Sequence, residues 1–82
     1  MNERVLNILS MCLQAVEKGH HVFLDYSGHV KGVNFRAFKG GYKKGKEYDI
    51  NLIFYMDDIY CDNAENLAKI DTIEAYLKEL IA

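Results

Sequence analysis

The chain has 82 residues, half of them hydrophobic, and a formal net charge of −2. This length predicts a single domain over residues 1–82 with a thin core, and it is too short for a nucleotide-binding sheet. No stretch approaches the ~18 apolar residues of a membrane span, and the first residues do not match a signal peptide, so we expect a cytoplasmic protein with no membrane contact.

The apolar content is high for so small a domain. Six Tyr and four Phe contribute to it, and a two-layer domain of this size cannot easily hide that much apolar surface. Some of these side chains should remain exposed. Because an exposed apolar patch usually marks a contact surface, self-association or binding to a partner is the first functional expectation.

The near-neutral total conceals two blocks of opposite charge. Residues 29–46 contain no acid and six cations, which are Lys31, Arg36, Lys39, Lys43, Lys44 and Lys46. Residues 47–82 contain nine acids against two lysines. The chain can therefore present a basic loop and an acidic helix to different partners, or to copies of itself.

Residues 3–18 show the apolar spacing of a helix face. The stripe consists of Val5, Leu9, Cys12 and Val16, with Leu6, Ile8 and Leu13 alongside. Gly19 follows at the position where helices commonly end in a left-handed residue. The pattern predicts an amphipathic helix in which Cys12 is a small core residue.

Three strands are predicted after this helix. Residues 20–26 are rich in β-forming side chains, and Ser27 and Gly28 supply a turn before a second strand over 30–38. Residues 39–47 contain glycines and lysines without periodicity, which predicts a loop. Alternation over 48–57 predicts the third strand.

The remaining residues predict a second helix over about 63–81. Asp62 and Glu65 have the spacing of a capping box, and apolar residues follow at helical intervals. The predicted fold is α+β: a two-layer domain in the order helix, three-stranded antiparallel meander, helix, with both helices on one face of the sheet.

The strand alternation also predicts which side chains remain uncovered. The side formed by Ile50, Leu52, Phe54 and Met56 is the more apolar side of the third strand, so it should face the helices together with Val22, Leu24, Val33, Phe35 and Ala37. The opposite face then groups aromatic residues around one arginine. We expect this face to be the partner-binding surface, with Phe23, Arg36, Phe38, Ile53 and Tyr55 as its binding residues.

The basic loop suggests an alternative. Residues 40–47 match most of a phosphate-binding loop, but Glu47 occupies the position of the required Ser or Thr, and a strand follows instead of a helix. A flexible hairpin loop explains the pattern better. The alternative function is nucleic-acid binding, in which Lys39, Lys43, Lys44 and Lys46 contact phosphates and Phe23, Phe38 and Tyr55 serve as exposed stacking platforms.

The predicted order of elements is similar to that of double-stranded-RNA-binding domains. Those domains contact phosphates with lysines at the start of their second helix, whereas here Asp62 and Glu65 precede the first cation, Lys69. This difference disfavours that mode of binding.

Catalytic and metal-binding patterns are weak. No two of His20, His21, His29 and Cys61 have the spacing of a zinc site, and Asp57, Asp58 and Asp62 do not match a calcium loop. Cys61 lies near a helix start but has no identifiable base. We therefore expect a non-enzymatic interaction module without metal or cofactor, which either forms a homodimer or docks on another protein.

Overall fold

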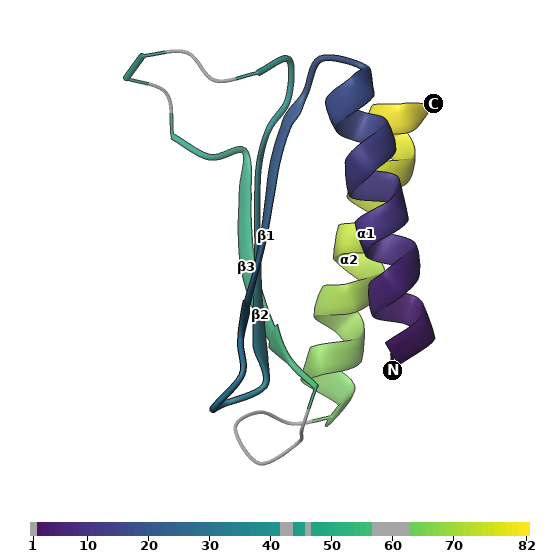
Figure 1. Ribbon diagram of the computed structural model, residues 1–82, viewed down its shortest axis with the longest axis vertical. Helices are drawn as coiled ribbons and strands as arrows, with labels where there is room; N and C mark the ends of the chain where they lie inside the picture. Colours follow the sequence, from purple (N-terminus) through teal and green to yellow (C-terminus); the bar gives the residue numbers. More distant parts are fainter. Residues whose placement is uncertain (1, 42–43, 46, 57–62) are drawn as a thin grey trace.

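The computed structural model describes residues 2–41, 44–45, 47–56 and 63–82 and forms two layers (Figure 1). The elements are α1 (Asn2–Glu17), β1 (His21–Ser27), β2 (Gly32–Phe38), β3 (Ile50–Tyr55) and α2 (Asn63–Ile81). The strands form one antiparallel sheet in the order β1-β2-β3. Both helices lie on the same side of this sheet (Figure 1), which confirms the predicted α+β architecture.

The strand register confirms the predicted inner face. Phe35 of β2 lies between Leu24 of β1 and Leu52 of β3, and the neighbouring inward positions follow the same alternation. The buried cluster comprises Ile8, Cys12, Ala15, Val33, Phe35, Ala37, Phe54, Ile70, Ile73, Leu77 and Leu80. The core therefore lies between the sheet and the two helices, as two-layer packing requires.

Helix α1 uses a different buried stripe from the one predicted. Ile8, Cys12 and Ala15 face the core, whereas Leu9 and Val16 are exposed. The three-to-four spacing was correct, but apolar residues cover more of the helix surface than one contact can bury. Cys12 is buried, as expected.

Gly19 ends α1 as predicted, with a positive φ of 94°. The Gly19 N–H donates to the Val16 carbonyl at 3.0 Å, and the His20 N–H donates to the Ala15 carbonyl at 3.2 Å. These two bonds form a Schellman motif, which satisfies carbonyls that the last helical turn leaves without partners. The chain can then reverse direction and enter β1.

His20 connects three elements immediately after this turn. Its Nδ1 accepts a hydrogen bond from the Gly40 N–H at 2.8 Å, and its Nε2 lies 3.2 Å from the Leu80 carbonyl oxygen. Because Nδ1 acts as an acceptor, the ring proton resides on Nε2, which donates to Leu80. The side chain thus links the start of β1, the turn after β2 and the end of α2.

β2 and β3 are shorter than the strands predicted over 30–38 and 48–57 because the connecting segments take more residues, whereas β1 keeps its predicted length and starts one residue later. Residues 28–31 form the β1–β2 turn, and Lys31 adopts φ 52° there. The predicted capping residue Asp62 lies outside the described residues. The buried Asn66 of α2 accepts a hydrogen bond from the Tyr55 N–H at 3.0 Å, which fixes the first turns of α2 to the end of β3.

Candidate functional site

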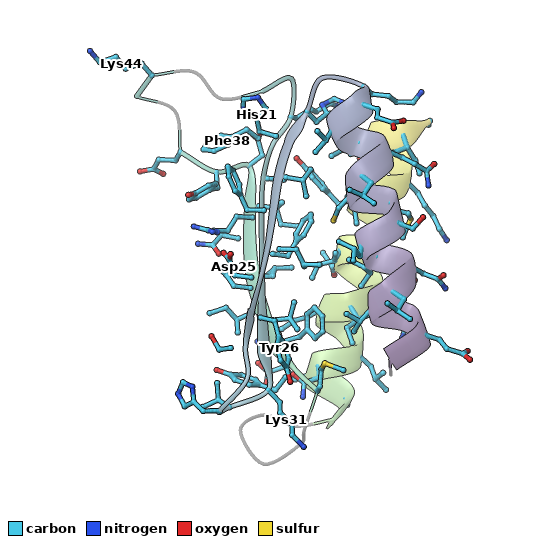
Figure 2. All side chains as sticks on the ribbon, viewed as in Figure 1. His21, Asp25, Tyr26, Lys31, Phe38 and Lys44 are labelled. Carbon is cyan, nitrogen blue, oxygen red and sulfur yellow. The ribbon has the colours of Figure 1, made fainter. Side chains whose placement is uncertain are left out.

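The five predicted binding residues all lie on the sheet face that is turned away from the helices. Phe23 of β1 and Asn51 of β3 flank Arg36 of β2 in the strand register, so Arg36 lies at the centre of this surface. Figure 2 shows Asp25 and Phe38 on this outer side, while Tyr26 points to the helix side. We call it the outer face and define it by Phe23, Asp25, Asn34, Arg36, Phe38, Tyr48, Asn51, Ile53 and Tyr55.

Arg36 is held between two aromatic rings. Its guanidinium carbon lies 5.3 Å from the ring centroid of Phe23 and 5.4 Å from that of Tyr48. Its Nη1 donates to the Tyr48 hydroxyl at 3.2 Å, and its Nη2 forms an ion pair with Asp25. Cation–π contacts and a charge-assisted hydrogen bond together restrict the arginine to one orientation.

Phe38 lies on the outer face but is not an exposed platform. Only 4% of its surface is accessible, because the Tyr48 ring packs against it at a centroid distance of 4.6 Å and the Phe23 ring meets it edge-on at 6.4 Å. The prediction that Phe38 is free to stack was therefore wrong. Phe38 instead supports the two rings that enclose Arg36.

Phe23 and Ile53 are the accessible predicted residues of this face, with exposures of 41% and 46%. Tyr55 is half-buried, since its ring lies against Gly32 of the adjacent strand, where a Cβ atom would come within 3.1 Å of it. Asn34 donates to the Asn51 side chain at 2.9 Å. The outer face thus combines exposed apolar groups with a fixed amide pair.

Sequence reasoning missed the role of Tyr48. The prediction started the third strand at residue 48, and alternation would then place Tyr48 on the helix side. The strand begins at Ile50, so the pleat does not constrain Tyr48, and its ring folds onto the outer face. The sequence carries no signal for this placement because it depends on the path of the preceding loop.

The predicted phosphate-contacting lysines are not presented as one cluster by the described residues. Lys39 pairs with Glu79 of α2 at 3.4 Å, and its backbone N–H donates to the Asp49 carboxylate at 2.6 Å. Lys44 is exposed at the far end of the loop (Figure 2). Lys43 and Lys46 lie outside the described residues.

Lys69, the first cation of α2 in the sequence, pairs with Glu65 one turn earlier at 3.4 Å. A partner that required a lysine from the start of this helix would have to displace that carboxylate. The arrangement agrees with the sequence argument against this route to RNA.

The described residues contain no group of three His, Cys, Asp or Glu side chains that could hold a metal ion. Asp57, Asp58, Cys61 and Asp62, at which the sequence predicts neither a metal site nor an active site, lie outside them. Burial raises the pKa of the Cys12 thiol to about 11, the opposite of what an activated nucleophile needs. Among the described helices, none has the length and apolar character to cross a membrane.

A shallow pocket lies between the two helices on the side away from the sheet. It is lined by Asn7, Ser10, Met11, Gln14, Glu74 and Lys78. Glu74 also accepts a hydrogen bond from Arg4 at 3.0 Å, so this carboxylate already has a structural role in joining the helices. The lining offers polar contacts but no nucleophile paired with a base.

A second exposed apolar surface was not identified as functional from the sequence. Leu6, Leu9, Leu13 and Val16 of α1 project away from the core. The available signal was the width of the apolar arc on residues 3–18, which exceeds what one buried contact requires.

Comparison with protein-family models, with curated proteins and with solved structures found no match.

Proposed function

We propose that this chain is a non-catalytic interaction module that binds another protein through its outer face. The observation that carries the proposal is the grouping of exposed Phe23 and Ile53 around Arg36, whose orientation is already fixed by Asp25 and Tyr48. Aromatic residues and arginine supply most of the energy of protein interfaces, and a prepositioned side chain loses little entropy on binding.

The position of Arg36 favours a different protein over a second copy on this face. A two-fold axis through the centre of a surface brings the same residue of both copies together. Here that residue is Arg36, so two outer faces would oppose two guanidinium groups. A partner with apolar side chains at its centre and hydrogen-bonding groups at its rim fits better, because Asn34 and Asn51 form part of the border.

Charge pairing favours a protein over nucleic acid. Arg36 of the outer face is paired with Asp25, and Lys39 of the basic block is paired with Glu79 of α2, so two of the candidate phosphate-binding cations are already compensated. Phosphate binding draws its strength from uncompensated Lys and Arg that release counterions. Binding through Phe23 and Ile53 has no such requirement.

The first prediction is that substitutions on the outer face weaken the binding of peptides to this chain. A random-peptide library displayed on phage supplies the peptides. Peptides selected against the wild-type chain should be rich in apolar and aromatic residues, and Ile53→Glu should weaken their binding about tenfold or more, because it places a carboxylate in an apolar contact. Phe23→Ser is the second variant. Ala75→Glu, at an exposed position of α2, is the matched control and should leave binding unchanged.

Isothermal titration measures the peptide affinities, and circular dichroism verifies that each variant is folded. Peptide binding that is equally strong in Ile53→Glu and Ala75→Glu would contradict the assignment to the outer face. Labelled single- and double-stranded oligonucleotides are tested in parallel at about 50 and 300 mM salt. Tight, steeply salt-dependent binding to them, lost in Lys39→Glu and Lys44→Glu, would replace the proposal with the nucleic-acid alternative.

A further inference from the structure

Tyr48 covers part of the outer face from a position outside the sheet. Its ring packs against the Phe38 ring at a centroid distance of 4.6 Å and lies edge-on to the Phe23 ring at 6.3 Å. Phe38 is buried beneath it, whereas Tyr48 itself is 39% exposed. Tyr48 therefore forms an outer layer over an aromatic surface that the strands present.

The side chains beneath Tyr48 are placed by the sheet. Phe23 of β1 is the register partner of Arg36 of β2, and Phe38 lies two residues further along β2. Alternation along the strands puts all three side chains on the same face. We call the space that Phe23, Arg36 and Phe38 border, and that the Tyr48 ring fills, the aromatic slot. The pleat, and not Tyr48, sets the positions of its three walls.

The pleat does not hold Tyr48 itself. β3 begins at Ile50, and Tyr48 precedes it outside regular secondary structure. The backbone is anchored one residue later, where the Asp49 N–H donates to the Ala37 carbonyl at 2.9 Å and the Asp49 carboxylate accepts from the Lys39 N–H at 2.6 Å. The Tyr48 side chain can thus leave the slot by a change of rotamer while β3 keeps its place, and such changes are common at interfaces.

The covered arrangement has one unfavourable feature. The Arg36 Nε–H is buried, and no acceptor among the described residues lies within hydrogen-bond distance of it. A donor of a charged group that is buried without an acceptor disfavours the arrangement that buries it. Because the Tyr48 ring lies against the guanidinium, its departure opens Arg36 to water or to an acceptor on a partner. The unsatisfied donor offsets part of the attraction between Tyr48 and the slot, which favours displacement.

We infer that the aromatic slot binds a tyrosine side chain of the partner protein, and that Tyr48 occupies the slot in the free chain until the partner displaces it. This inference rests on the proposed function, since it names the group by which the partner enters the outer face. The partner's hydroxyl takes over the hydrogen bond that Arg36 Nη1 donates to Tyr48 at 3.2 Å in the free chain. Asp25 and Phe23 continue to hold Arg36 while the rings exchange.

The lining of the slot selects a phenol ring over other side chains. The Arg36 guanidinium carbon lies 5.4 Å from the Tyr48 ring centroid, a cation–π contact that an aliphatic side chain does not form. Phe38 offers a ring face for a tilted stack, at an interplanar angle of 35° to Tyr48. The Nη1 donor requires an acceptor, which phenylalanine lacks and tyrosine provides. Tyr48 makes all three contacts, so a tyrosine of the partner can make them too.

The second prediction concerns removal of the internal ring. Peptides selected against the wild-type chain should bind Tyr48→Ala about tenfold more tightly than the wild type, because the slot no longer has to be vacated. Tyr48→Phe keeps the ring but loses the acceptor for Arg36, so it should bind them about threefold more tightly. Tyr26→Ala removes an exposed tyrosine of the helix side and is the matched control with unchanged affinity. Isothermal titration measures the affinities, and circular dichroism verifies folding.

The sign of the change distinguishes displacement from a permanent role of Tyr48 in the contact surface. A permanent role would make Tyr48→Ala bind more weakly. Equal or weaker binding by folded Tyr48→Ala and Tyr48→Phe would overturn the inference and leave the proposed function standing, as long as binding still depends on Ile53. Peptide binding that is insensitive to Ile53→Glu in every background would contradict the proposed function instead.

The identity of the bound group is tested on the peptide. Replacing its tyrosine by leucine should weaken binding to Tyr48→Ala about tenfold or more, and replacing it by phenylalanine about threefold, because phenylalanine keeps the ring and loses the hydroxyl. In a folded Tyr48→Ala, Arg36→Met chain, the tyrosine and phenylalanine peptides should bind equally, since the donor is gone. Selected peptides without tyrosine, or peptides that tolerate leucine, would overturn the assignment of a tyrosine to the slot.

Discussion

At the scale of single residues, Lys31 has the least favourable backbone conformation among the described non-glycine residues. It adopts φ 52° in the turn between β1 and β2. A side chain in this left-handed region costs about 1 kcal/mol or more, whereas glycine adopts it freely. The Lys31 carbonyl accepts a hydrogen bond from the Met56 N–H at 2.8 Å, so the turn also supports the end of β3.

The third prediction follows from this conformation. Lys31→Gly should raise the free energy of unfolding by about 0.5–1 kcal/mol, because the relief of strain exceeds the extra entropy of the unfolded chain. Urea denaturation measures the change. Lys44→Gly is the control for charge removal, since Lys44 is an exposed lysine of the loop before β3. An equal gain in both variants would mean that charge removal, and not backbone strain, is responsible.

Residue-level prediction succeeded where geometry is fixed by alternation. Once the apolar side of β3 was known, the pleat determined that Phe23, Arg36 and Ile53 lie on the outer face. The accessibility of Phe38 could not be predicted in this way. It depends on Tyr48, which precedes β3 and is positioned by the loop instead of by the pleat.

At the scale of secondary structure, the limits of the helices were well predicted and the strand limits less so. Gly19 ends α1 through local hydrogen bonds, and such local signals are visible in sequence. The face of α1 was harder to predict. Both of its sides are apolar, and which one is buried depends on the position of α2, which a single sequence does not encode locally.

The fourth prediction concerns the contact among elements made by His20. His20→Ala should lower the free energy of unfolding by about 1 kcal/mol, because the Gly40 N–H and the Leu80 carbonyl lose their side-chain partner. Amide hydrogen exchange at Gly40 should accelerate as well. His29→Ala, in the exposed β1–β2 turn, is the matched control and should change neither quantity. Unchanged exchange at Gly40 in His20→Ala would show that the bond contributes little.

At the scale of the whole molecule, the two charge blocks of the sequence come into contact. Lys39 from the basic block pairs with Glu79 from the acidic block, at the end where His20 also joins the turn to α2. The sequence predicted that the two charged blocks form separate surfaces. It did not predict the ion pair between them, because the fold decides which residues distant in the sequence come into contact. The prediction that some apolar side chains remain exposed is confirmed, and the exposed ones include Phe23 and Ile53 on the outer face and Leu6, Leu9, Leu13 and Val16 on α1.

The fifth prediction concerns the pH dependence of global stability, which the buried Cys12 should influence. Burial raises the pKa of its thiol to about 11, above the ordinary value of about 8.5 expected in the unfolded chain. The folded state therefore holds the proton more tightly. This stabilisation is complete below the unfolded pKa and is lost as the pH rises through the folded pKa.

Cys12→Ala provides the comparison, because other groups that titrate at alkaline pH are common to both proteins. In a Cys61→Ser background, the chain with Cys12 should be more stable than Cys12→Ala by about 1 kcal/mol at pH 8, since the substitution removes buried volume. That difference should shrink between pH 8 and about 10.5, where the thiol ionises in the unfolded chain but not in the folded one. Urea denaturation at several pH values measures it. A difference that stays constant across this range would show that the Cys12 thiol titrates alike in both states, and its contribution to the core would then be one of packing alone.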